Sequence, residues 1–132
     1  MPVLATLLFG AALMQDPPAP GAAYAACLDR ASGVTSEMRD CSAAEYERQD
    51  QALNATYRDL MARLPAELKT ELRDAQRAWI GFRDAECDYR SLAQGGTLGL
   101  LVRDSCWLDL TTARVARLRD ELEIVTELGA PY

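Results

Sequence analysis

The chain of 132 residues contains no histidine, and its 14 basic residues include a single lysine, Lys69. Histidine is the commonest general base of enzymes and the commonest ligand of transition metals, so two frequent ways of building a reactive site are absent. The sequence also lacks a phosphate-binding glycine loop, a dinucleotide-binding glycine motif, a nucleophile elbow and a CxxC pair. These absences favour a binding protein over an enzyme, and we expect no catalytic residues, no cofactor and no metal ion.

Acidic residues outnumber basic ones, and the formal net charge is −6. A negative surface repels nucleic acid and anionic membranes, and it attracts basic proteins over a Debye length of about 8 Å at physiological salt. The same charge can also serve solubility alone. We therefore expect a protein partner and no nucleic-acid partner.

The N-terminal apolar run, Val3–Met14, is too short to cross a bilayer and has the length of a signal-peptide hydrophobic region. Ala23-Tyr24-Ala25 offers a small-residue cleavage pattern, although no basic residue precedes the apolar run. We predict that residues 1–25 are a signal peptide and processing region and that residues 26–132 form one helical domain. The protein is then periplasmic or secreted, without a stable membrane anchor.

Four cysteines follow this segment: Cys27, Cys41, Cys87 and Cys106. An even number in a small exported domain indicates two disulfides. Cys87 lies nine residues before Gly96 and Cys106 nine residues after Thr97, so an antiparallel helical hairpin would bring both to one height. That disulfide is feasible if both side chains face the seam, and the remaining two cysteines would then pair. A crossed pairing stays open, because all four lie near one end of such a bundle.

Apolar residues recur at helical spacing over three long segments: 46–64, 68–89 and 101–125. Ser42–Glu45 has the pattern of a capping box at the start of the first segment, and Pro65 begins the second. The residues Gln94-Gly95-Gly96-Thr97 indicate a flexible turn, and a short helix is expected over Tyr24–Ala31. We predict an all-α fold, an antiparallel three-helix bundle with a short N-terminal helix, stapled by two disulfides.

Four side chains of the last two segments could lie in the hydrophobic core or have a functional role. Trp79 and Phe82 are in phase with the leucines and are expected in the core. Trp107 is out of phase and is the better candidate for a partly exposed contact. Glu86 lies at a core position, where we favour a half-buried carboxylate paired with an arginine of a neighbouring helix. A muramidase-like enzyme that uses Glu86 is the weaker hypothesis.

Several stretches form a recognisable pattern together with Cys41 and Cys106: Asp50-x-x-Leu53-Asn54-x-x-Tyr57-x-x-Leu60, Leu72-x-x-Ala75-Gln76-x-Ala78-Trp79-x-x-Phe82-Arg83-Asp84-x-x-Cys87, Gly95-Gly96-Thr97 and Thr112-x-Arg114-x-x-x-Leu118. This pattern resembles the LprI-type lysozyme-inhibitor family of bacterial exported proteins. The match runs from about Cys27 to Leu122, and the block Ala75–Cys87 is its most specific part. The resemblance implies a small helical envelope domain, with at least one member type that inhibits lysozyme.

The resemblance leads us to expect an exported binding protein that inhibits lysozyme-type muramidases. Lysozymes are strongly basic and cut peptidoglycan in a cleft, so an acidic protein would be steered to them and a protruding loop, Ser91–Leu98, could occlude the cleft. The expected contact residues are Asp84, Asp88, Gln94, Gly95, Gly96, Thr97, Asp104 and Trp107. The alternative is an envelope adaptor or scaffold that binds another protein and does not act on lysozyme.

The expected export of the protein can be tested. Mass spectrometry of the protein recovered from a bacterial periplasm should show cleavage before Cys27 and no thiol that reacts with an alkylating reagent before reduction. An uncleaved cytoplasmic protein with four reduced cysteines would contradict it.

Overall fold

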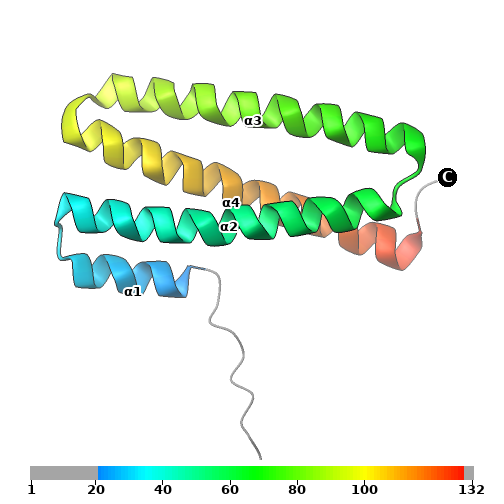
Figure 1. Cartoon of the computed structure of the whole chain (residues 1–132), viewed down its shortest axis with the longest axis horizontal. Coiled ribbons are helices and arrows are strands. Elements are labelled where there is room, and N and C mark those ends of the chain that lie inside the picture. Colours follow the sequence, from blue (N-terminus) through cyan, green and yellow to red (C-terminus); the bar gives the residue numbers. More distant parts are fainter. Residues whose placement is uncertain (1–20, 130–132) are drawn as a thin grey trace, which may run out of the picture.

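The computed structural model describes residues 21–129, and this part of the chain forms four helices and no strand (Figure 1). Their bounds are Ala22–Ala31 for α1, Thr35–Arg63 for α2, Ala66–Gln94 for α3 and Gly96–Leu128 for α4. The predicted signal region lies largely outside the described residues, although its last four, 22–25, belong to α1. The expected short N-terminal helix and the all-helical fold are confirmed.

The helices end where the sequence contains glycine or proline. Leu64 adopts an extended conformation before Pro65, as steric contact with the proline ring favours, and α3 begins directly afterwards. Gly95 and Gly129 terminate α3 and α4 with φ angles of 69° and 81°, which residues with a Cβ seldom adopt.

Helix α2 begins well before its predicted start at Ser42, so the capping-box prediction is wrong. The Ser42 hydroxyl donates instead to the carbonyl of Met38 at 3.1 Å, in the middle of the helix. The Glu45 carboxylate accepts hydrogen bonds from Arg48 and Gln49, at 2.8 and 3.0 Å. No proline or glycine lies between Thr35 and Ser42, so nothing local stops the helix from extending toward α1.

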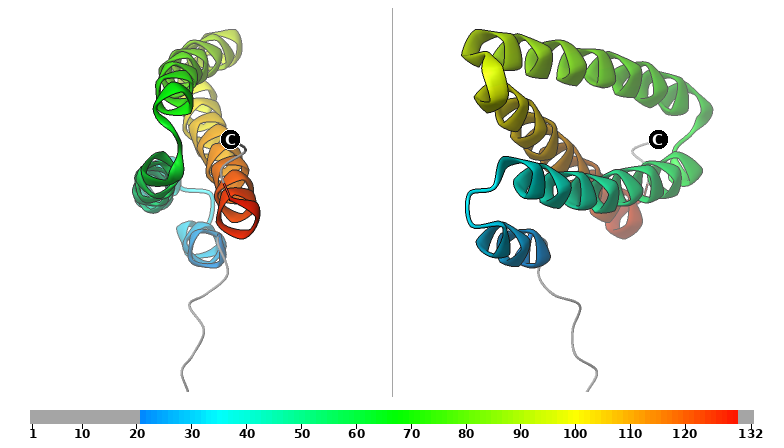
Figure 2. Two further views of the ribbon diagram at one scale, coloured as in Figure 1. Left: turned by 90° about the vertical axis from the view of Figure 1, so that its right-hand side faces the viewer. Right: turned by 60° about the vertical axis from the view of Figure 1, so that its left-hand side comes forward.

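Helix α4 packs along both α2 and α3, whereas α2 and α3 have little direct contact although a short turn joins them. Figures 1 and 2 show α4 slanting from beside α3 at one end of the molecule to beside α2, with α3 held apart from α2. The arrangement is therefore more open than the predicted bundle. Several polar side chains of α2 are buried as well: Ser42, Glu45, Gln49 and Thr56.

The apolar core is small and lies between α2 and α4. Its fully buried members are Leu53, Leu60, Val115 and Leu118. Trp79 packs against this cluster from α3 and is partly buried. Phe82, which the sequence pattern also assigns to the core, is 55% exposed, and that prediction is wrong. The physical reason is that α3 packs closely on α4 alone, so an apolar side chain on its other faces stays in water.

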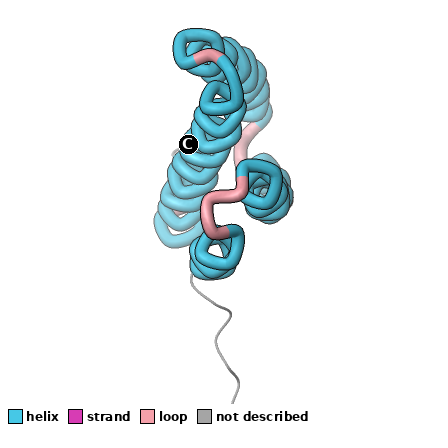
Figure 3. Tube along the Cα trace, turned by 90° about the vertical axis from the view of Figure 1, so that its left-hand side faces the viewer, coloured by secondary structure: helices cyan, strands magenta, loops and turns pink. Residues whose placement is uncertain are grey.

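Two disulfides cross-link neighbouring helices at one end of the molecule. Cys27 of α1 joins Cys41 of α2 with a Cα–Cα distance of 5.7 Å, and Cys87 of α3 joins Cys106 of α4 at 5.5 Å. The pairing expected from the hairpin register is confirmed. Figure 3 looks at this end, where the α1–α2 and α3–α4 turns both face the viewer.

The Cys87–Cys106 disulfide should contribute substantially to stability. It closes a loop of 19 residues in the unfolded chain, for which chain entropy predicts about 3 kcal/mol. We expect the double variant Cys87→Ala/Cys106→Ala to lower the free energy of unfolding in urea by about this amount, measured by far-UV circular dichroism. A matched control, Cys27→Ala/Cys41→Ala, should cost less because Cys27 is only partly buried. An unchanged midpoint in the first variant would contradict the prediction.

Candidate partner-binding site

The α3–α4 hairpin ends in a tight tip with one residue, Gly95, between the two helices. The Gly95 N–H donates to the carbonyl of Ser91 at 2.9 Å, and Gly96 follows with a φ of 57°. Two consecutive glycines at positive φ allow the chain to reverse in so few residues. The predicted loop Ser91–Leu98 is therefore wrong in extent, since all of it except Gly95 is helical.

Gly99 brings the two helix backbones into contact beside the tip. A Cβ at this buried position would lie 2.5 Å from the carbonyl oxygen of Ser91, closer than real Cβ contacts come. The sequence interpretation did not single out Gly99. A glycine inside an otherwise helical segment was the available signal, because such a glycine often marks a close approach of two backbones.

Four large apolar side chains around the tip are exposed to solvent. Tyr89 is 67% exposed, Leu92 83% and Leu98 55%, and Leu100 is also classed as exposed. All four lie within six residues of Gly95, so the tip presents apolar side chains to solvent. The predicted contact residues Gln94, Gly95, Gly96 and Thr97 lie between them in the sequence and are exposed as well.

The three aspartates predicted at the contact each form an ion pair with an arginine. Asp84 pairs with Arg83 at 2.9 Å, and Asp88 of α3 pairs with Arg103 of α4 at 2.9 Å. Asp104 of α4 accepts a hydrogen bond from Arg39 of α2 at 2.8 Å, and this bond together with the nearby charge raises the pKa of Arg39 above its ordinary value. The latter two pairs link neighbouring helices, so these acids are less free to contact a partner than the sequence suggested.

Trp107 is half-buried, with its ring centroid 5.5 Å from that of Tyr46. The guanidinium carbons of Arg83 and Arg103 lie 5.1 and 5.0 Å from the Trp107 ring centroid. Its indole nitrogen is buried and has no hydrogen-bond partner in the described part of the chain. Trp107 therefore packs chiefly against protein side chains between the helices.

Arg83 is the centre of this arrangement and is only 8% exposed. Its guanidinium carbon lies 5.2 Å from the Trp79 ring centroid, and its Nη1 donates to the Tyr46 hydroxyl at 3.2 Å. A cation held against aromatic rings out of water gains about 2 kcal/mol or more. Arg83 thus connects α3 to α2, two helices that otherwise scarcely touch. Sequence reasoning missed this role, although Arg83 belongs to the most specific block of the motif.

Glu86 has a different partner from the one predicted. It accepts a hydrogen bond at 2.8 Å from Arg90, one turn further along the same helix, and not from a neighbouring helix. Residues 21–129 also contain no group of three His, Cys, Asp or Glu side chains placed to hold a metal ion.

Arg83 should matter more for stability than an exposed arginine nearby. We expect Arg83→Ala to lower the free energy of unfolding by about 2–4 kcal/mol, through loss of the cation–aromatic contacts and the hydrogen bond to Tyr46. The control Arg90→Ala removes an exposed pair within one helix and should cost about 0.5 kcal/mol. Urea denaturation followed by tryptophan fluorescence measures both, and equal effects would contradict the central role of Arg83.

None of the helices in the described range 21–129 combines the length and apolarity that a membrane span needs. No solved structure matches the chain. An uncharacterized protein of Rhizobium meliloti (strain 1021) is 32% identical over 101 residues, which cover 66% of this chain and 73% of the relative. The family described as lysozyme inhibitor LprI matches residues 27–118, which include both disulfides and the hairpin tip. The chain therefore belongs to the LprI lysozyme-inhibitor family.

Proposed function

We propose that this protein is an extracytoplasmic inhibitor of lysozyme-type muramidases that inserts the tip of its α3–α4 hairpin into the substrate cleft of the enzyme. The observation that carries the proposal is the exposure of four large apolar side chains near a narrow helical tip, in a chain of an inhibitor family. The mechanism is occlusion of the cleft. It needs no catalytic residue in the inhibitor, which agrees with the histidine-free sequence.

The tip is rigid before it meets a partner. The buried Cys87–Cys106 disulfide joins the two helices about two to three turns below Gly95, and the Gly99–Ser91 contact packs their backbones together closer to the tip. A preformed binding element loses less conformational entropy on association than a flexible loop does. The helical tip therefore suits inhibition better than the flexible loop expected from the sequence.

The net charge of the protein affects the rate of association with the enzyme. The net charge of −6 favours encounter with a basic enzyme through the long-range field of the whole molecule. The predicted acids Asp84, Asp88 and Asp104 contribute to this field but already pair with arginines at close range. We therefore assign the affinity mainly to the apolar tip and the speed of association to charge.

The location follows from the same proposal. The family name points to a target outside the cytoplasm, and two disulfides persist best in an oxidising compartment. Residues 1–25 would then be the export segment and residues 26–132 the mature domain, in the periplasm or secreted.

The tip can be tested with a matched pair of leucines. Leu92 at the tip is 83% exposed, and Leu128 at the C-terminal end of α4 is 81% exposed. We expect Leu92→Asp to raise the concentration needed for half-inhibition of lysozyme at least about tenfold, since an unpaired charge would enter the contact. Leu128→Asp should change it little. The measurement is lysis of a cell-wall suspension by lysozymes of several classes, with circular dichroism to verify folding.

Two results would contradict the proposal. If the wild-type protein in molar excess leaves every lysozyme class fully active, the inhibitor function is wrong and the adaptor alternative takes its place. If wild type inhibits but both leucine variants inhibit equally well, the inhibitor function stands and the tip is the wrong surface.

A further inference from the structure

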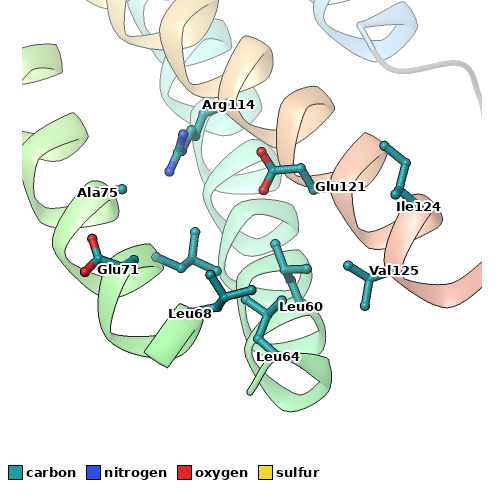
Figure 4. Close-up of a pocket in the computed structure, with 10 residues that line it drawn as sticks. Leu60, Leu64, Leu68, Glu71, Ala75, Arg114, Glu121, Ile124 and Val125 are labelled. Carbon is teal, nitrogen blue, oxygen red and sulfur yellow. The ribbon is translucent and has the colours of Figure 1, made fainter. Parts of the chain in front are cut away.

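An apolar groove of about 390 Å³ lies where the C-terminal end of α2, the N-terminal part of α3 and the C-terminal part of α4 come together (Figure 4). Its apolar walls include Leu60 and Leu64 of α2, Leu68 and Leu72 of α3, and Val125 of α4. The groove lies where α3 and α4 diverge on either side of α2 (Figures 1 and 4). Its volume falls in the range typical of small-molecule sites, roughly 300–1,000 Å³.

Arg114 of α4 is the one cation among the residues that line the groove, and Figure 4 shows its side chain directed into it. Its Nε donates to the side-chain oxygen of Gln76 at 2.9 Å, and its guanidinium carbon lies 5.8 Å from the Trp79 ring centroid. These two contacts hold the guanidinium in one orientation. Within residues 21–129 it forms no ion pair within 4.0 Å with a carboxylate.

The guanidinium of Arg114 is partly buried, and a bound anion would stabilise its charge. Loss of water contact lowers the pKa of Arg114 below its ordinary value, although arginine remains charged at any physiological pH. A charge that is partly removed from water is unfavourable, and Glu121, whose charge attracts Arg114, does not pair with it within 4.0 Å. A purely apolar occupant of the groove would remove more water from Arg114 and increase that cost, whereas a carboxylate would form a charge-assisted, bidentate pair with it.

Two acids also line the groove, but they influence its choice of ligand head group less than Arg114 does. Glu121 accepts a hydrogen bond from Arg117 at 3.3 Å, so its charge is already engaged. Glu71 is exposed, and solvent screens its charge. The guanidinium of Arg114 is held in place by Gln76 and Trp79 and can donate to a ligand, so we expect it to decide which head group the groove prefers.

We propose that the groove binds a single-chain carboxylate amphiphile of the fatty-acid class. The alkyl chain lies along the leucines of α2 and α3, and the carboxylate accepts hydrogen bonds from Arg114. This site is at the opposite end of α3 from the hairpin tip and does not depend on the inhibitor function. Arg114 and Gln76 both belong to the motif stretches, yet nothing in the spacing of the sequence brings them together.

The test compares three ligands with the same alkyl chain and different head groups. Dodecanoate, dodecanol and dodecyltrimethylammonium are titrated into the oxidised wild-type protein, each below the concentration at which it forms micelles. Isothermal titration calorimetry gives the affinity and stoichiometry, and tryptophan fluorescence reports on Trp79 beside Arg114. We expect saturable binding of one dodecanoate, at least about tenfold tighter than either of the other two ligands.

Three variants separate the head-group contact from the groove. Arg114→Gln should weaken dodecanoate binding about tenfold and leave dodecanol binding unchanged, because the alkyl contacts remain. Arg119→Gln removes an exposed charge from the same helix and should have little effect. Glu121→Gln should strengthen dodecanoate binding, since it removes a negative charge from the groove.

The proposal is overturned by any of three results. These are no saturable binding of dodecanoate, equal or tighter binding of the trimethylammonium ligand, or an unchanged dodecanoate affinity in folded Arg114→Gln. If that variant does not fold, the ligand series on the wild-type protein still decides the question.

Discussion

The guanidinium of Arg83 lies among side chains of all three long helices and links α3 to α2, two helices that otherwise have little direct contact. The leucine and valine core joins α2 to α4, while α3 contributes Trp79 and Leu72 only at its margin. Arg83 reaches past this core to the hydroxyl of Tyr46 on α2 and lies against the rings of Trp79 and Trp107. A polar and aromatic cluster thus holds α3 to α2, whereas an apolar interface would hold these helices together in a closed bundle.

The two ends of the α3–α4 hairpin differ because of this arrangement. At the tip end, a disulfide, a glycine contact and an ion pair between Asp88 and Arg103 bind the two helices tightly. At the other end, where α3 begins after Pro65, α3 and α4 diverge on either side of α2, and leucines line an open groove. Rigidity favours a surface that must enter a partner, and openness favours a site that must admit a small ligand. The proposed protein contact and the proposed ligand site therefore lie where the packing suits each.

The strong preference for arginine over lysine fits the way these side chains are used. Arg83, Arg103 and Arg114 each place a planar guanidinium over a tryptophan ring, within about 6 Å of its centroid. A lysine ammonium is more strongly hydrated and lacks a flat face, so it would be less stable in these positions. Arg90 and Arg117 are used differently, in exposed ion pairs within one helix.

The sequence by itself determined the three long helical segments and the breaks between them, and it favoured the pairing of Cys87 with Cys106. These features follow from periodicity along one helix and from the equal distances of two residues from a glycine turn, which are local properties. The tertiary structure alone decided that Phe82 is exposed, that Arg83 is buried and that Arg114 faces a groove. An apolar stripe looks the same in sequence whether one neighbouring helix covers it or two. The number of neighbours of α3 depends on contacts between residues far apart in the chain, such as Arg83 with Tyr46, and no local pattern records them.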